Sequence, residues 1–245
     1  MNIYATIVES KSKGKKQFAI LIDPDKLTEN EEERIAKQAQ EAGVDFIFVG
    51  GSLLTNDNLN TCITTLKKEC TIPIVLFPGS TLQINNQADA ILFLSLISSR
   101  NAEMLIGKHV ESAPYLKASG LEILSTGYML IESGRPTAVS YMSNSTPIPH
   151  DKNEIAICTA IAGELLGLKL LFMDGGSGAI NPVSKEMIAA VHKNSSIPLL
   201  IGGGIKTPEK ALENCIAGAD IIVVGNAIEK DKSIIKQISQ AIHSI

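Results

Sequence analysis

Residues 170–226 read LLFMDGGSGAINPVSKEMIAAVHKNSSIPLLIGGGIKTPEKALENCIAGADIIVVGN, and this stretch decides the fold class. Its apolar runs are Leu170–Asp174, Pro198–Gly202 and Asp220–Gly225, and its helix-compatible segments between them are Val183–His192 and Pro208–Ala217. Each run is continuously apolar rather than alternating, which is typical of parallel strands buried on both faces. Strands that alternate with helices indicate right-handed crossovers and therefore a parallel sheet.

The same alternation continues toward the N-terminus. Further strands are expected at Phe18–Asp23, Phe46–Gly50, Pro73–Pro78, Ala90–Ile97 and Leu121–Ser125. Further helices are expected at Glu29–Ala42, Asp57–Glu69, Asn153–Leu166 and Glu229–Ile242. Eight units average about 31 residues each, the size of one βα unit. The sequence therefore predicts a closed (β/α)8 TIM barrel, with residues 1–245 forming one domain.

An open, doubly wound sheet is the alternative architecture. Such a sheet normally carries a glycine-rich turn after its first strand, whereas the first strand here ends in Asp23-Pro24-Asp25. The barrel is therefore the favoured interpretation.

Two connections depart from regular spacing. Residues 79–89 are too few for a crossover with its own helix, so we expect helix three to be missing or replaced by a loop. Residues 126–152 are unusually many before the next helix begins, and long segments of this kind are usually functional or mobile.

Composition excludes several classes of protein. The 245 residues are 44% hydrophobic with a net charge of −4, which argues against a disordered chain and against a nucleic-acid-binding protein. The four cysteines form no C-x-x-C pair, the N-terminus does not resemble a signal peptide, and Ala88–Ser99 is too short to span a bilayer. A soluble cytoplasmic protein with reduced thiols is expected.

Glycines follow the last two strands, at Gly203, Gly204 and Gly225. In a barrel this position is the usual phosphate site, because glycine lets backbone N–H groups approach an anion and a helix N-terminus adds positive potential. The alternative is that these glycines only form tight turns.

Asp174 ends the sixth strand and precedes Gly175-Gly176-Ser177-Gly178. The glycine-rich run adds backbone amides to the same site. Asp174 would repel a phosphate but suits a substrate hydroxyl, which a carboxylate orients and deprotonates. Alternatively, Asp174 only caps a turn.

Asp23 and Asp25 follow the first strand, and Ser52 follows the second. Hard oxygen ligands suit Mg2+, which typically takes one or two carboxylates together with substrate phosphates and waters. Asp-Pro-Asp is also an ordinary turn sequence, so this pattern alone leaves both interpretations open.

Several motifs occur in the order of a known family. They are Ile22-Asp23-Pro24-Asp25-Lys26, Val49-Gly50-Gly51-Ser52, Thr126-Gly127-Tyr128, Ser145-Thr146-Pro147-Ile148-Pro149, Met173-Asp174-Gly175-Gly176-Ser177-Gly178-Ala179, Ile201-Gly202-Gly203-Gly204-Ile205 and Val224-Gly225-Asn226. This arrangement resembles the geranylgeranylglyceryl phosphate synthase family, which includes bacterial heptaprenylglyceryl phosphate synthases. The resemblance spans about residues 18–228, and the Ser-Thr-Pro-Ile-Pro and acid-Gly-Gly-Ser-Gly-Ala segments are its most specific parts.

The resemblance implies transfer of a polyprenyl group, geranylgeranyl in the expected case, from its diphosphate to the 3-hydroxyl of sn-glycerol 1-phosphate. The family uses Mg2+, and Asp23 and Ser52 would hold the metal. Asp174 would orient and deprotonate the hydroxyl. The glycerol phosphate would be bound by Tyr128, Phe172, Met173, Asp174, Gly175, Gly176, Ser177, Gly178, Gly203, Gly204, Gly225 and Asn226. The resemblance also suggests a homo-oligomer, and the lipid product suggests transient membrane contact.

The chain departs from the family pattern at a few positions. It has Asp174 where many relatives have glutamate, Phe172 where tyrosine is frequent, and Leu21 where some bacterial relatives have lysine. The missing third helix also leads us to expect an apolar groove for the prenyl tail, near Leu76, Phe77, Leu82, Leu92 and Leu94.

Two other functions stay open at this point. One is another phosphate-binding barrel enzyme, such as a phosphosugar isomerase or lyase, which would favour a lysine at a strand end for a Schiff base, and no strand here offers a convincing one. The other is a non-catalytic phosphometabolite-binding protein, for which Asp23 and Asp174 would have no use.

Overall fold

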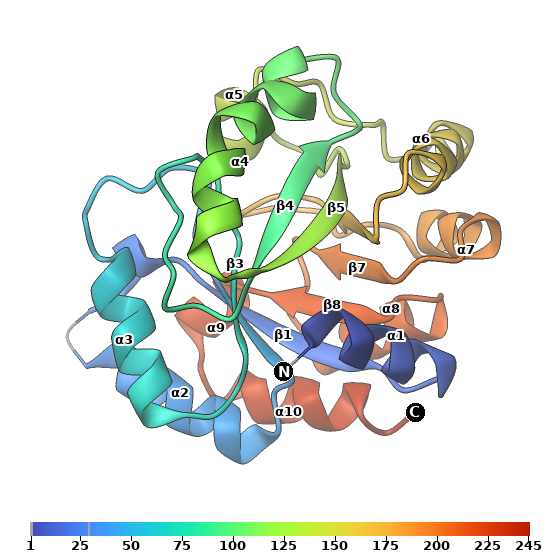
Figure 1. Ribbon diagram of the computed structural model, residues 1–245. Coiled ribbons are helices and arrows are strands. Elements are labelled where there is room, and N and C mark those ends of the chain that lie inside the picture. Colours follow the sequence, from blue (N-terminus) through green and yellow to red (C-terminus); the bar gives the residue numbers. More distant parts are fainter. Residues whose placement is uncertain (1, 29) are drawn as a thin grey trace.

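The computed structural model describes residues 2–28 and 30–245. Its strands form a closed parallel barrel in which each strand pairs with the next along the chain, and β1 pairs with β8 to close the ring (Figure 1). The barrel prediction is thus confirmed, and the open sheet is excluded. The strands are β1 (Gln17–Ile22), β2 (Phe46–Val49), β3 (Ile74–Leu76), β4 (Ala90–Leu96), β5 (Glu122–Leu130), β6 (Leu170–Asp174), β7 (Leu199–Gly202) and β8 (Ile221–Val224).

Helices surround the barrel, and several begin with a side-chain cap. Ser184 accepts a hydrogen bond from the Met187 amide, and Thr207 accepts one from the Lys210 amide, just before Pro208. The helices are α1 (Ile3–Ser12), α2 (Glu31–Ala42), α3 (Leu59–Glu69), α4 (Lys108–Ser119), α5 (Ala138–Met142), α6 (Asn153–Leu165), α7 (Lys185–Asn194), α8 (Pro208–Ile216), α9 (Asn226–Lys230) and α10 (Ile234–Ile242), with a 3-10 turn η1 (Pro24–Lys26) and a π-helical turn η2 (Glu103–Gly107).

Two apolar cores follow from the alternation of side chains along each strand. Met129 and Met173 belong to the outer core, between the strands and the helices. Tyr128, Leu130 and Phe172 belong to the inner core, inside the ring. Because successive residues of a strand face opposite sides, this register turns Asp174 toward the ring interior.

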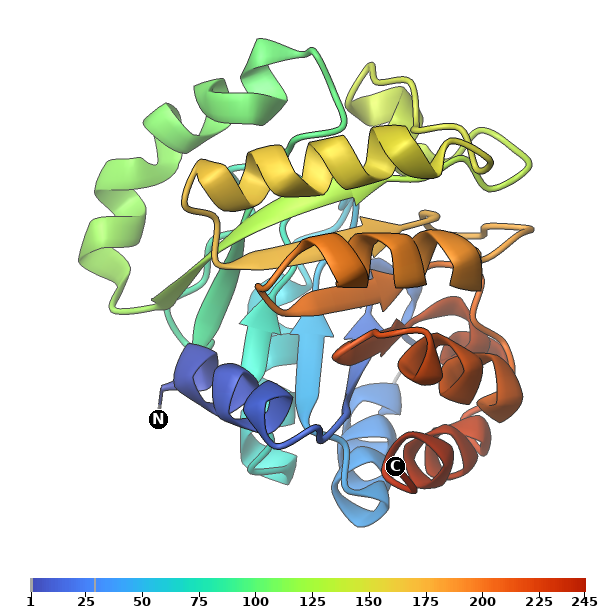
Figure 2. The same ribbon diagram turned by 90° about the vertical axis from the view of Figure 1, so that its right-hand side faces the viewer.

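Helix α1 closes the end of the barrel at which the strands start (Figure 2). Its Ile3 and Ile7 belong to the inner core, and the Glu122 carboxylate accepts hydrogen bonds from the Ile3 and Tyr4 amides at 2.6 and 2.8 Å. This helix was not among the predicted elements, because only Ile3 and Ile7 of its residues are buried and its apolar face is short. This end of the barrel is therefore covered by α1, and the opposite end is the one at which the strands finish.

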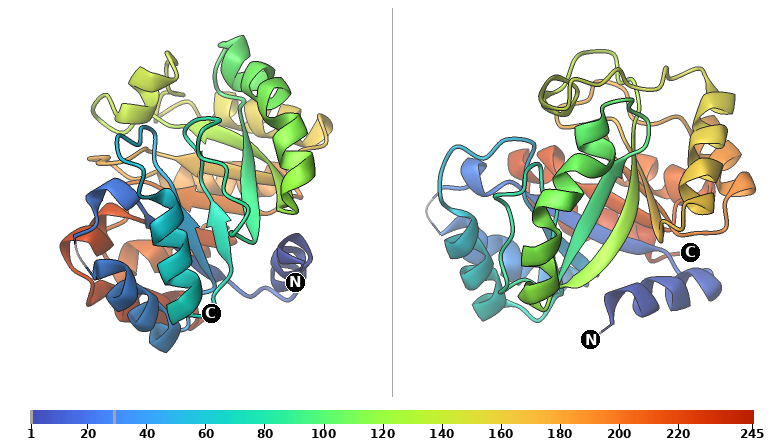
Figure 3. Two further views of the ribbon diagram at one scale, coloured as in Figure 1. Left: turned by 60° about the vertical axis from the view of Figure 1, so that its left-hand side comes forward. Right: turned by 45° about the horizontal axis from the view of Figure 1, so that its top comes forward.

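No helix lies between β3 and β4 in the described chain, as the sequence predicted. The connecting residues form a loop that lies between α3 and α4 (Figure 3). Gln83 holds this loop: its side chain donates to the Gly51 carbonyl at 2.9 Å and accepts from the Gly79 amide at 3.2 Å. The flank of the barrel beside β4 is therefore covered by a loop instead of a helix.

Some expected boundaries were wrong. Strand β5 continues to Leu130, well past the expected end at Ser125, so Tyr128 lies in a strand and not in the long connection. The expected closing helix Glu229–Ile242 is two helices, because the backbone of Asp231 is extended. The expected helix start at Glu29 lies outside the described residues, and α2 begins at Glu31. Among the described helices, none is long and apolar enough to cross a membrane.

Candidate active site

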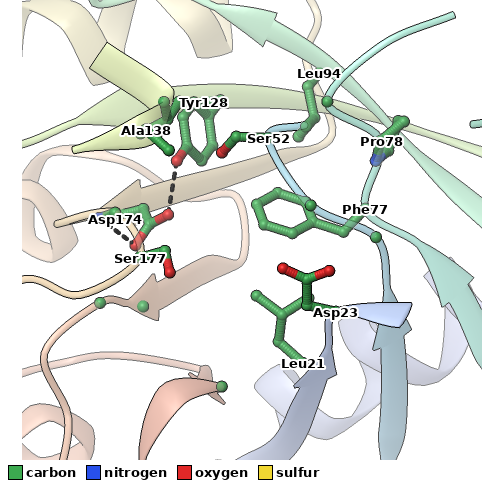
Figure 4. Close-up of a pocket in the computed structure, with 18 of the residues that line it drawn as sticks. Leu21, Asp23, Ser52, Phe77, Pro78, Leu94, Tyr128, Ala138, Asp174 and Ser177 are labelled. Carbon is green, nitrogen blue, oxygen red and sulfur yellow. Dashed lines mark hydrogen bonds between the residues drawn. The ribbon is translucent and has the colours of Figure 1, made fainter. Parts of the chain in front are cut away.

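A cavity of about 1070 Å³ opens at the carboxyl ends of the strands. Its walls include Asp23 after β1, Ser52 after β2, Asp174 at the end of β6 and Asn226 after β8. This is the face on which barrel enzymes carry their chemistry, because loops from every strand converge there. Figure 4 shows Asp23 and Asp174 on opposite sides of this cavity.

Asp174 and Tyr128 form a buried pair on one wall. The Tyr128 hydroxyl donates a hydrogen bond to Asp174 Oδ2 at 2.6 Å (Figure 4), and the Gly176 amide donates to Asp174 Oδ1 at 2.8 Å. Strand pairing sets this contact, because Tyr128 pairs with Phe172 in register, two residues before Asp174. Both side chains are more than nine-tenths buried and line the cavity.

Burial determines the ionisation of this pair. It raises the pKa of Asp174 above the usual aspartate value, against the opposing effect of the hydrogen bonds from Tyr128 and Gly176. It also raises the pKa of Tyr128 well above its usual value, and the adjacent carboxylate adds to that effect. Tyr128 is therefore a neutral donor, and Asp174 is a carboxylate of increased basicity.

Backbone amides form a cradle next to this pair, which we call the amide cradle and define as residues 176–178, 203–204 and 225. The amides of Ser177, Gly203, Gly204 and Gly225 donate to no acceptor among the residues that the structure describes. The Gly178 amide, in contrast, is already bonded to Asn226 Oδ1 at 3.0 Å. The unpaired amides are suited to binding the oxygens of an anion without any basic side chain.

Glycine is required in the cradle at Gly203. Its φ is +79°, and a Cβ atom there would lie 2.6 Å from the Gly175 nitrogen and 2.7 Å from Asp174 Oδ1. The conformation and the space both exclude a side chain. Gly203 thereby brings the turn after β7 directly against the end of β6.

Asp23 and Ser52 line the cavity on the side away from Asp174, and we call them the Asp23 corner. Asp23 Oδ1 accepts from the Asp25 amide at 3.2 Å, and Oδ2 lies 3.4 Å from the Lys26 ammonium. Asp25 is not in this corner: its Oδ2 accepts bonds from the Thr55 amide and hydroxyl, which lower its pKa despite burial. Asp25 therefore anchors a loop through Oδ2 and is not among the residues that line the cavity, while its Oδ1 is buried without a partner among the described residues.

Aromatic rings separate the two walls. The ring centroids of Phe77 and Phe172 are 5.4 Å apart in a stacked arrangement, and those of Phe172 and Tyr128 are 5.6 Å apart, edge to face. Figure 4 shows the Phe77 ring between Asp23 and Tyr128. Aromatic faces stabilise nearby positive charge, so this cluster suits a reaction that develops a carbocation.

From the aromatic cluster the cavity extends along the flank of the barrel toward α4. Lys108, Ser112 and Leu116 are spaced four residues apart, so they share the face of α4 that lines it. His109 also lines it, 3.1 Å from the Ser95 hydroxyl, and burial lowers its pKa, which keeps the ring neutral near pH 7. The remaining wall is mainly apolar: Ile84, Ile91, Leu92, Phe93, Leu94 and Met104.

Comparison with known proteins agrees with this geometry. The sequence profile of the PcrB family matches residues 11–242. The chain belongs to the PcrB family. A protein of Chitinophaga pinensis named geranylgeranylglyceryl phosphate synthase is 55% identical over 99% of this chain and 96% of its own length. One of Spirosoma linguale with the same name is 51% identical over 95% of this chain and 93% of its own length.

Solved structures of this group share the fold closely. The (S)-3-O-geranylgeranylglyceryl phosphate synthase of Thermoplasma acidophilum, in complex with its substrate sn-glycerol-1-phosphate, superposes with a TM-score of 0.94 at 32% identity, covering all of both chains. This PcrB family member is accordingly a prenyltransferase, and the family resemblance stated from its motifs is confirmed.

The structure of this PcrB family member brings nearly all of the expected site residues to one cavity. Met173 and Gly175 are the exceptions: Met173 packs in the outer core, and the Gly175 amide bonds to the Gly202 carbonyl at 3.2 Å. The cavity is lined by the others, namely Asp23, Ser52, Tyr128, Phe172, Asp174, Gly176, Ser177, Gly178, Gly203, Gly204, Gly225 and Asn226.

Of the residues named for the expected prenyl groove, some line the cavity and others do not. Phe77, Leu92 and Leu94 line the cavity, whereas Leu76 is buried in the outer core and Leu82 is 90% exposed. Arg135 and one face of α4 also line the cavity and were not among the predicted site residues. The α4 face carries Lys108 and Ser112 beside Leu116, so no apolar repeat marks it in the sequence.

Proposed function

We propose that this chain catalyses Mg2+-dependent transfer of a geranylgeranyl group from its diphosphate to the 3-hydroxyl of sn-glycerol 1-phosphate. The observation that carries the proposal is the position of Asp174. Its buried, hydrogen-bonded carboxylate lies between the amide cradle, which suits a phosphate, and the aromatic start of an apolar groove, which suits a prenyl tail.

The chemistry follows from this arrangement. The cradle amides bind the phosphate of the glycerol substrate and direct its free hydroxyl toward Asp174. The hydroxyl oxygen forms a bond to C1 of the prenyl group, while the bond from C1 to the diphosphate oxygen breaks. The Asp174 carboxylate accepts the proton of that hydroxyl. Tyr128 holds the carboxylate in position throughout, because its hydroxyl remains protonated.

Charge at the reacting carbon is stabilised by the aromatic cluster. An allylic group that loses diphosphate carries positive charge in the transition state, and the faces of Phe77 and Phe172 border the path from the groove to Asp174. Most of the rate enhancement in this scheme comes from positioning and electrostatics.

The residues of the Asp23 corner fit Mg2+. They supply one carboxylate and one hydroxyl, both hard oxygen donors on the cavity wall, and Mg2+ commonly binds one or two protein oxygens while substrate phosphates and waters complete its octahedron. The described residues contain no cluster of three or more acidic, histidine or cysteine side chains that would hold a metal without such help. When bound, the metal neutralises charge on the departing diphosphate.

A direct assay tests the proposal. The purified protein is incubated with sn-glycerol 1-phosphate and prenyl diphosphates of graded length, with Mg2+ or with EDTA, and the products are identified by mass spectrometry. We expect a prenylglyceryl phosphate ether that forms only with both substrates and the metal. The proposal fails if prenyl diphosphate is consumed without ether formation or at the same rate in EDTA.

Location and assembly are part of the same proposal. We infer a cytoplasmic enzyme that forms a homo-oligomer and that meets the membrane transiently, the last because its apolar substrate and product reside in lipid. Sedimentation of the purified protein, with and without vesicles, measures the oligomeric state and the membrane contact.

A further inference from the structure

Arg135 lies on the connection between β5 and α5, which packs against the amide cradle. The Ser133 carbonyl accepts hydrogen bonds from the Ile180 and Asn181 amides at 3.2 and 3.0 Å. Thr137, two residues after Arg135, forms a reciprocal capping box with Ser140 at the start of α5. Arg135 is therefore held between two anchored points of the backbone.

The Arg135 guanidinium lies directly on the cradle. A Cβ atom at Gly178 would be 2.2 Å from Arg135 Nη2, and one at Gly176 would be 2.8 Å from the Thr137 hydroxyl oxygen. Both glycines have positive φ, +74° and +82°. Absence of side chains at these positions lets the arginine reach the cavity wall, which it lines.

Arg135 also differs from the other arginines in its partners. Arg34 donates to the Glu31 carboxylate at 3.2 Å, and Arg100 donates to the Ser99 carbonyl at 3.0 Å. Arg135 donates to no acceptor in residues 2–28 or 30–245. Four lysines also line the cavity: Lys26 is shared between Asp23 and Glu229, at 3.4 and 3.1 Å, Lys108 pairs with Glu111 at 3.2 Å, and Lys206 and Lys230 follow β7 and β8.

We propose that Arg135 binds the phosphate group of the glycerol substrate, beside the unpaired amides of the cradle. This inference rests on the proposed function, and it assigns a specificity-determining side chain to a cradle otherwise made of backbone. A planar guanidinium binds two phosphate oxygens at once, and such charge-assisted bonds are about twice as strong as neutral ones. Arg135 thereby favours a phosphorylated acceptor over free glycerol.

The test measures binding by titration calorimetry with two probes, sn-glycerol 1-phosphate and inorganic phosphate. In Arg135→Gln we expect Kd for both probes to rise about 10- to 100-fold, the loss expected for hydrogen bonds to a charged group. Arg135→Lys should recover part of the affinity, because lysine keeps the charge but loses the bidentate geometry. The matched control is Arg34→Gln, which removes the same charge on α2 and should leave both Kd values unchanged.

Kinetics add a readout that a structural role would not change. In Arg135→Gln the KM for sn-glycerol 1-phosphate should rise, while the KM for the prenyl diphosphate and the melting temperature stay as in the wild type. The inference is overturned if Arg135→Gln binds both probes normally, or if only the KM for prenyl diphosphate rises. A wild-type protein that binds neither probe overturns the proposed function itself. If Arg135→Gln melts at a lower temperature than the wild type, the Kd values of Arg135→Lys decide the inference instead.

Discussion

The Tyr128 hydroxyl lies 2.6 Å from Asp174 Oδ2, across the junction of two neighbouring strands, and both side chains are buried. The bond stabilises the ionised carboxylate, since it lowers a pKa that burial raises. The ionisation of Asp174 therefore depends on a residue that lies 46 positions earlier in the sequence.

Removal of that hydroxyl should shift the pH profile. In Tyr128→Phe the pKa of Asp174 rises further, so the acid limb of the kcat/KM profile moves to higher pH, and kcat/KM at pH 7 falls about 10-fold or more. In the wild-type enzyme the midpoint of the acid limb should already lie above the usual aspartate pKa of about 3.9. Tyr115→Phe, an exposed tyrosine on α4, serves as the control. An unshifted acid limb in Tyr128→Phe would remove Tyr128 from this role.

Asp174 itself should be required for turnover but not for binding. Asp174→Ala and Asp174→Asn remove the base, so we expect kcat to fall at least about 100-fold. Binding of sn-glycerol 1-phosphate, measured by calorimetry, should persist, because the cradle amides remain. Asp151→Asn changes the charge equally at an exposed position. Full activity in Asp174→Asn would rule out the proposed base.

The groove should determine how long a prenyl chain is accepted. Leu94 lines the groove, so Leu94→Trp should lower kcat/KM for long prenyl diphosphates about 10-fold relative to short ones. The control is Leu82→Trp, which adds the same ring to a 90% exposed side chain outside the cavity wall. Product lengths are compared by mass spectrometry, and equal preferences in the two variants would place the tail elsewhere.

Gly203 should tolerate no side chain, whereas Gly120 offers a control with the same backbone strain. Both have φ near +79°, at +79° and +78°, but a Cβ at Gly120 would meet no atom within 4 Å. The left-handed backbone should cost each alanine variant about 1–2 kcal/mol of unfolding free energy, and Gly203→Ala should lose more than that because its Cβ would lie 2.6 Å from the Gly175 nitrogen. Only Gly203→Ala should also lose binding of sn-glycerol 1-phosphate. Calorimetry that detects normal binding in Gly203→Ala would contradict the close approach seen at this turn.

The end of the chain should stabilise the fold in a pH-dependent way. His243 Nε2 lies 2.9 Å from Asp45 Oδ2, a contact that raises the pKa of the histidine above its usual value. Its contribution is fully present below the unfolded pKa of about 6.5 and is lost as pH rises through the higher folded pKa. For this partly exposed pair we expect about 0.2–1 kcal/mol. Wild type and His243→Gln should thus differ in unfolding free energy more at pH 5.5 than at pH 8.5, and an equal difference at both would exclude the pair.

The fold was largely predictable because strand signals in this chain are local. Continuous apolar runs such as Leu170–Asp174 form strands wherever both faces are buried, and the short connection after β3 leaves no room for a helix. Helix α1 was not predictable in the same way, since its two buried isoleucines matter only once the barrel floor exists. The end of β5 was missed because Gly127 interrupts its apolar run.

The site was predictable where backbone geometry requires a residue type. Gly203 and Gly225 follow strands that must end at the cavity, and the motif order located Asp23 and Asp174. The direction of individual side chains was harder to predict from the sequence. Met173 faces outward and the Asp25 carboxylate binds Thr55, although each residue is a near neighbour of a site residue in the sequence. Arg135 carries no local signal, because its role depends on contact with Gly178 across two loops.

The pairing of β1 with β8 has a consequence for biosynthesis. Asp23 follows the first strand and Gly225 follows the last. The parts of the cavity wall that carry these two residues therefore come together only after nearly the whole chain has left the ribosome. A nascent chain without β8 leaves the edges of β1 and β7 open, and open edges invite pairing with other chains. Ligands that bind only the closed ring draw the equilibrium toward it, so supply of the phosphorylated substrate during expression should increase the yield of folded protein.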